Sequence, residues 1–79
     1  MKTFHLTISR VDMPLFDGQA ISATVPGVAG EMTILADHSP IISPLKTGTI
    51  LIKAEGGEES IDVKSGTLEM SDNHLTILV

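Results

Sequence analysis

The side chains that could support chemistry are few and lie far apart in the chain. The three histidines, His5, His38 and His74, fall on three separate predicted elements, and none stands at the close spacing of a metal-binding motif. A zinc or iron site could form only if a barrel with an open interior brought them together, yet the inward positions are apolar. We therefore expect surface or loop histidines, with no metal and no other cofactor.

Ser39 directly follows His38, but this pairing does not indicate a catalytic nucleophile. Adjacent residues in a strand or loop point in different directions, and no nucleophile elbow, phosphate-binding loop or pair of carboxylates accompanies them. The acidic run of Glu55, Glu58 and Glu59 brackets two glycines and is typical of a solvated hairpin tip that protects a sheet from aggregation. We predict a protein without catalytic residues.

One lysine supports an alternative function, that of a lipoyl- or biotinyl-type carrier or a small-ligand β-module. Carrier domains present the modified lysine at the tip of a tight hairpin, and Lys53-Ala54 is the candidate in this acidic, cysteine-free chain. Lys53 is expected inside a strand, before the turn at Gly56-Gly57, and it lacks the flanking Asp or Met pair of carrier domains. The intact mass after expression with a lipoyl or biotinyl ligase distinguishes this alternative.

Size and charge exclude several classes of protein. A chain of 79 residues forms one domain, and a domain of this size buries only about 60% of the surface of its unfolded chain. The net charge of -5 opposes nucleic-acid binding, which depends on the release of counterions by basic side chains. No apolar run approaches the roughly 18 residues of a membrane span, and the first residues do not resemble a signal peptide. We expect neither nucleic-acid binding nor direct membrane insertion.

Apolar and polar residues alternate along most of the chain, which is the pattern of half-buried strands. The first strand runs from Phe4 to Arg10 and ends before Pro14, which lacks an amide donor. We expect the second strand in two pieces around a turn or bulge at Asp17-Gly18. Its second piece turns three side chains inward, namely Ile21, Ala23 and Val25.

The rest of the chain repeats short strands and turns. Pro44 marks an edge strand, because proline cannot donate to a central ladder, and Glu55-Gly56-Gly57-Glu58 predicts a tight hairpin. Turn signals recur about every eight to ten residues, and no apolar run has the spacing of a helix. The sequence therefore predicts a single all-β domain over residues 1–79, an antiparallel sandwich or flattened barrel of about eight to ten short strands.

The segment from Val25 to Pro40 is more specialised than the rest. It reads as a glycine-rich loop, a short strand at Met32 to Leu35, and a second loop that ends in His38-Ser39-Pro40. Exposed loops on a rigid scaffold are where binding sites are commonly found. We expect this segment to carry the function.

Five ordered blocks, taken together, resemble the N-terminal domain of the epsilon subunit of bacterial F-type ATP synthase over essentially the whole chain. No single block is specific, but their order and spacing match the family. The blocks are Leu15-Phe16-Asp17-Gly18; Val25-Pro26-Gly27 with Gly30-Glu31-Met32-Thr33-Ile34-Leu35; His38-Ser39-Pro40; Leu45-Lys46-Thr47-Gly48-Thr49-Ile50; and Ser65-Gly66-Thr67-Leu68-Glu69-Met70 before Leu75-Thr76-Ile77-Leu78.

The resemblance implies a ten-stranded flattened β-sandwich in the central stalk of the rotary enzyme. Such a domain is clamped to the gamma subunit, rests on the ring of c subunits and catalyses nothing. It transmits torque at the cytoplasmic face of the bacterial inner membrane while ion flow drives ATP synthesis. The resemblance also assigns two loops: a c-ring-facing loop of Gly27, Val28, Ala29, Gly30 and Glu31, and a gamma-facing loop of Asp37, His38, Ser39 and Pro40.

The chain departs from the family's pattern in two places. Epsilon subunits continue into a pair of helices that inhibit ATP hydrolysis and in some members bind ATP, whereas this sequence stops at Leu78-Val79. We carry over neither property and expect a naturally short form. The block at Ser65-Gly66-Thr67 has one glycine where many relatives have two followed by Phe, which affects only the expected shape of that turn.

Overall fold

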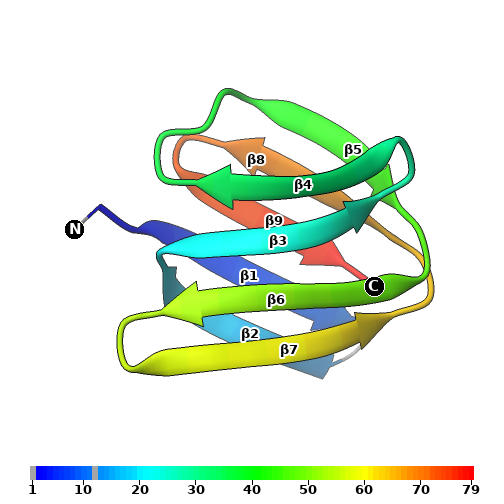
Figure 1. Ribbon diagram of the computed structural model, residues 1–79, viewed down its shortest axis with the longest axis horizontal. Coiled ribbons are helices and arrows are strands. Elements are labelled where there is room, and N and C mark those ends of the chain that lie inside the picture. Colours follow the sequence, from blue (N-terminus) through cyan, green and yellow to red (C-terminus); the bar gives the residue numbers. More distant parts are fainter. Residues whose placement is uncertain (1, 12) are drawn as a thin grey trace.

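The computed structural model describes residues 2–11 and 13–79, in which every regular element is a β-strand (Figure 1). This confirms the predicted all-β class. The described residues contain no helix that is long and apolar enough to cross a membrane. The strands of the described residues are β1 (Phe4–Arg10), β2 (Met13–Ala20), β3 (Ser22–Gly27), β4 (Gly30–Leu35), β5 (Ile41–Leu45), β6 (Gly48–Ala54), β7 (Gly57–Val63), β8 (Gly66–Ser71) and β9 (His74–Leu78).

The strands form two layers that pack face to face (Figure 1). One layer has the order β2-β1-β9-β8-β5, and the other has the order β4-β3-β6-β7. The layers are joined where Gly27 of β3 pairs with Leu45 of β5. The pairing of β1 with β9 is parallel, unlike the antiparallel arrangement expected. Parallel strands cannot be joined by a hairpin, and here the whole intervening chain connects the two.

The core lies between the layers and follows the predicted alternation. Phe4, Leu6 and Ile8 are fully buried, as expected for the first strand. Burial of these apolar side chains is the main favourable term in folding a domain without disulfides or metal staples. The other buried apolar residues are Ala20, Ala23, Val25, Ile34, Leu45, Ile50, Ile52, Val63, Leu68, Met70, Leu75 and Ile77.

The second strand differs from its prediction. Asp17-Gly18 is neither a turn nor a bulge, because both residues form regular pairs with Thr7 and Leu6 of β1. The register instead shifts where Ile8 pairs with Phe16 and Ser9 pairs with Pro14, which leaves Leu15 as the extra residue of a bulge. The proline, which cannot donate to the ladder, lies beside this irregularity, so the bulge follows the proline rather than the Asp-Gly pair.

The interruption between the two strands comes at Ile21, which lies between the end of β2 and the start of β3. Ala23 and Val25 are fully buried as predicted, but Ile21 is only half-buried. Its amide donates to the carbonyl of Lys53 at 2.7 Å, so Ile21 acts as the corner where the chain passes from one layer to the other.

The predicted hairpin is confirmed, and the predicted edge strand is confirmed only in part. The β6–β7 hairpin turns at Glu55-Gly56, with Ala54 paired to Gly57. The strand that contains Pro44 is close to an edge strand, because β5 pairs along its length with β8 but with β3 at a single residue. Pro44 itself is exposed.

Candidate functional site

The glycine-rich tip predicted at Gly27–Glu31 is a tighter hairpin than expected. Gly27 closes β3 and pairs with Gly30, and Glu31 already pairs with Pro26, so the loop itself is only Val28 and Ala29. The sequence placed too many residues in the loop, because Gly27 is needed for close approach and Gly30 for a positive φ of 141°, both within paired strands. A Cβ on Gly27 would lie 2.6 Å from the carbonyl oxygen of Gly30.

The tip is held against the other layer by backbone hydrogen bonds. The Val28 amide donates to the Pro44 carbonyl at 3.1 Å, and the Lys46 amide donates to the Pro26 carbonyl at 2.9 Å. The Val28 side chain is 57% exposed, and Glu31 beside it is also exposed. The tip therefore presents two apolar side chains, Val28 and Ala29, and the acidic Glu31 from a hydrogen-bonded backbone.

The second predicted loop, Asp37–Pro40, connects β4 to β5 and contains no strand. Asp37 has a positive φ of 63°, a conformation that Asp tolerates better than most residues. The His38 amide donates to the Leu35 carbonyl at 3.2 Å, which closes the turn. His38 Nδ1 lies 2.7 Å from the Ser39 carbonyl oxygen, so the imidazole is oriented within its own loop, while Ser39 and Pro40 are exposed.

Asn73, which sequence reasoning treated only as a turn residue, supports this loop. Its Oδ1 accepts a hydrogen bond from the Asp37 amide at 2.7 Å, and its Nδ2 donates to the Thr3 carbonyl at 2.9 Å. Lys2 also pairs with the Asp37 carboxylate at 3.0 Å, although both side chains are largely exposed. No local signal reveals Asn73, because the residues it joins are far from it in the sequence.

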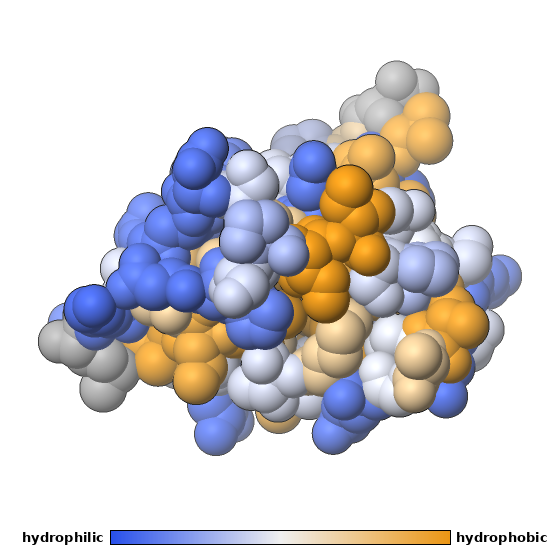
Figure 2. Space-filling model, turned by 90° about the horizontal axis from the view of Figure 1, so that it is seen from above, coloured by the Kyte–Doolittle hydropathy of each residue, from blue (hydrophilic) through white to orange (hydrophobic). Residues whose placement is uncertain are grey.

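The two loops lie at opposite ends of β4 (Figure 1). A strand of this length, Gly30–Leu35, spans roughly 20 Å. Each end carries an exposed apolar side chain, Val28 at 57% and Leu35 at 54%. Figure 2, which shows the side of the molecule formed by β4 and β5, has apolar surface in separate groups among polar side chains.

His5 and His74 lie on separate strands, as expected, but these strands are neighbours in the sheet. The two histidines occupy paired positions on β1 and β9, and their rings stack with centroids 4.3 Å apart. His5 Nε2 lies 2.5 Å from Asp17 Oδ1, and His74 Nε2 lies 3.1 Å from Thr7 Oγ1. The hydrogen bond from His5 is the main cause of a lowered pKa at Asp17. His38 lies on a different loop, as predicted.

The side chains considered for catalysis and for carrier function, His38 and Lys53, interact with other groups. His38 bonds to the carbonyl of Ser39, and no hydrogen bond joins its imidazole to the Ser39 hydroxyl in the described residues. Lys53 lies within β6, opposite Glu58, and its Nζ is 3.8 Å from the Glu58 carboxylate. Across residues 2–11 and 13–79, no group of three or more potential ligands is placed to hold a metal ion.

Comparison with known protein families identifies the family of this chain. The family model of the ATP synthase delta/epsilon chain β-sandwich domain matches residues 3–79. This chain belongs to the ATP synthase delta/epsilon family. Similar curated proteins are the ATP synthase epsilon chains of Bordetella petrii, 39% identical over 79 residues, and of Rhodopseudomonas palustris, 32% identical over 78 residues. Each alignment covers 99% of this chain, but only 56% and 58% of those relatives.

Solved structures show the same fold. A chain of the Euglena gracilis mitochondrial ATP synthase OSCP/F1/c-ring structure aligns with a TM-score of 0.90 and 24% identity, over 98% of this chain and 50% of that one. A chain of the Tetrahymena thermophila mitochondrial ATP synthase central stalk and c-ring structure aligns with a TM-score of 0.83 and 13% identity, over 99% and 63%. At these identities the likeness establishes the fold.

Proposed function

We propose that this β-sandwich is a non-catalytic rotor element of an F-type ATP synthase, which couples the gamma subunit to the c ring at the cytoplasmic face of a bacterial inner membrane. The observation that carries the proposal is the family match over residues 3–79, with curated epsilon chains as relatives. The chain spans slightly more than half the length of those relatives, so the proposal concerns this domain and not a longer protein's regulation.

The separation of the two loops supports this role. A coupling element needs two contact surfaces held at a fixed distance, and β4 provides that spacing between the Gly27–Glu31 tip and the Asp37–Pro40 loop. Both loops are anchored, the tip to Pro44 and the second loop to Asn73. A force applied at one loop therefore reaches the other through hydrogen-bonded backbone rather than through flexible chain.

Surface chemistry at the two loops fits contact with different partners. Glu31 at the tip can pair with a basic group on the polar loops of the c ring, while Val28 supplies apolar contact area. A single exposed ion pair contributes only about 0–1 kcal/mol, so seating must depend on shape and on apolar contact as well. We assign the Asp37–Pro40 loop to the gamma subunit.

The test separates the two surfaces. Glu31→Lys should weaken seating on the c ring and leave gamma binding intact, because the substitution reverses the charge at the tip. His38→Ala should weaken gamma binding instead, because it removes an imidazole that is oriented within the second loop by the Ser39 carbonyl. Binding of each variant to purified gamma and to purified c ring, measured separately, reads out both effects.

Equal loss of both interactions in Glu31→Lys would show that Glu31 was assigned to the wrong contact surface. The carrier alternative has its own test, since attachment of a single lipoyl or biotinyl group by the matching ligase would overturn the coupling role. Lys53, the lysine in question, lies inside β6, which does not favour modification.

A further inference from the structure

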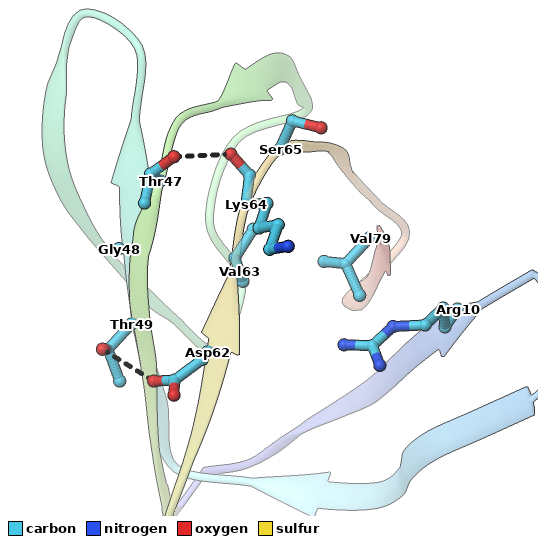
Figure 3. A pocket seen from close by; sticks show the side chains of 9 residues that line it. All are labelled: Arg10, Thr47, Gly48, Thr49, Asp62, Val63, Lys64, Ser65 and Val79. Carbon is cyan, nitrogen blue, oxygen red and sulfur yellow. Dashed lines mark hydrogen bonds between the residues drawn. The ribbon is translucent and has the colours of Figure 1, made fainter.

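A cavity of about 770 Å³ opens at the end of the sandwich where β1 and β9 finish and β6 begins (Figure 3). This volume lies within the range of small-molecule sites. No residue of the Gly27–Glu31 tip or of the Asp37–Pro40 loop lines this cavity. Its lining residues are Arg10, Thr47, Gly48, Thr49, Asp62, Val63, Lys64, Ser65 and Val79.

Two cationic side chains point into this cavity from opposite walls. Figure 3 shows the Arg10 guanidinium and the Lys64 ammonium group directed towards the same space, with the Val79 side chain between them. Neither group forms an ion pair or a side-chain hydrogen bond with any residue that the structure describes. Two of the five basic residues in a chain of net charge -5 thus converge on one site.

The acidic residue of the lining does not neutralise these cations. The Asp62 carboxylate accepts a hydrogen bond from the Thr49 hydroxyl at 3.2 Å and is turned towards Thr49 (Figure 3). The Thr47 hydroxyl donates to the Lys64 carbonyl at 2.9 Å, which fixes the backbone that carries Lys64. Val63 and Val79 add apolar surface to the walls.

We propose that this cavity binds a small soluble organic anion, a carboxylate or phosphate attached to an apolar group. The guanidinium of Arg10 matches the two oxygens of such a head group in a bidentate manner, and Lys64 supplies a second charge-assisted donor. The apolar part lies against Val63 and Val79. The cavity lies at the same end of the sandwich as the Gly27–Glu31 tip (Figure 1), but none of its lining residues belongs to the tip or to the Asp37–Pro40 loop, so the proposal does not rest on the coupling role.

Titration of the isotopically labelled chain, followed by NMR, tests the site. Hexyl phosphate and hexanoate should shift the Val63 and Val79 methyl signals saturably, with a Kd on the order of 1 mM or below. Inorganic phosphate should bind more weakly, because it lacks the apolar group. Arg10→Gln and Lys64→Gln should each weaken binding at least about tenfold, the effect of losing one charge-assisted hydrogen bond.

Lys53→Gln is the matched control, because it removes one positive charge at the other end of β6, where Lys53 pairs with Glu58. It should leave binding unchanged. An equal loss of affinity in all three variants would mean that only the net charge of the protein matters, which would contradict a specific site. Unchanged binding in folded Arg10→Gln and Lys64→Gln would also contradict it. Association only with phosphatidylglycerol vesicles, and not with hexyl phosphate, would also contradict the proposal.

Discussion

Histidine at position 5 contacts two neighbours that the sequence alone does not connect. Its ring stacks on His74 and its Nε2 meets the Asp17 carboxylate, so a polar cluster lies across three strands on the surface of one layer. Sequence spacing could not predict this cluster, because it depends on the parallel register of β1 with β9. The sequence predicted histidines on separate elements, which holds for His5 and His74, but it did not predict that their rings would be in contact.

Asp17 should make stability depend on pH in a defined direction. Its pKa lies below the ordinary value of 3.8, chiefly because the hydrogen bond from His5 favours the charged carboxylate. A lowered pKa in the folded state means that the stabilisation is present above 3.8 and is lost as the pH falls through the folded value. Asp17→Asn should therefore destabilise the protein near neutral pH and less in acid. Chemical denaturation at both pH values measures this, and a pH-independent difference would contradict it.

Gly66 is required for close approach between β8 and the end of β9. A Cβ at this position would overlap the Leu78 carbonyl oxygen and would lie 3.2 Å from two carbon atoms of Val79. Gly66→Ala should reduce the free energy of unfolding by about 1–3 kcal/mol, because neighbouring backbone must shift. Urea denaturation provides the measurement.

Gly18→Ala is the control for that substitution, since a Cβ on Gly18 would be 3.9 Å from the Phe16 ring, an ordinary contact. It should change stability by less than about 1 kcal/mol. A similar loss in the two variants would show that glycine in a strand, and not the Leu78 overlap, is the cause.

At the scale of elements, β4 and the turns at its ends form the proposed contact unit. The short strand in this segment was predicted at Met32 to Leu35, and the structure begins it two residues earlier, at Gly30. Alternation of buried and exposed residues predicts a strand reliably, whereas the last paired residue of a hairpin depends on backbone contacts that composition does not reveal. Asp17-Gly18 shows the same limit, because a pair typical of turns is held in a regular strand by tertiary contacts.

Asn73 should stabilise the Asp37–Pro40 loop that follows β4, although it lies in the turn between β8 and β9. Asn73→Gly removes its hydrogen bonds to Asp37 and Thr3 and should cost about 1–2 kcal/mol of stability. Asn73→Ala should cost about 1 kcal/mol more, because Asn73 has a φ of 59° that a residue with a Cβ adopts at a penalty. Denaturation of both variants gives these differences. Wild-type stability in Asn73→Gly would show that the side chain does not anchor the loop.

For the whole molecule, the meeting of β1 with β9 unites the first and last strands in one layer. The all-β class and most of the core could be predicted from periodicity, since the inward positions of β1, β6, β8 and β9 are the buried ones. The order of strands in the sheet could not, because pairing between distant segments leaves no local pattern. The result is a rigid body with its proposed contacts at opposite ends of β4.

The most direct test of the coupling role is co-purification of the folded chain with the gamma subunit at low and moderate salt. We predict a stable complex under both conditions, because a surface that depends on shape and apolar contact is only partly screened by salt. Far-UV circular dichroism or NMR should first show that the chain is folded. A folded chain that fails to bind gamma at either salt concentration would contradict the account.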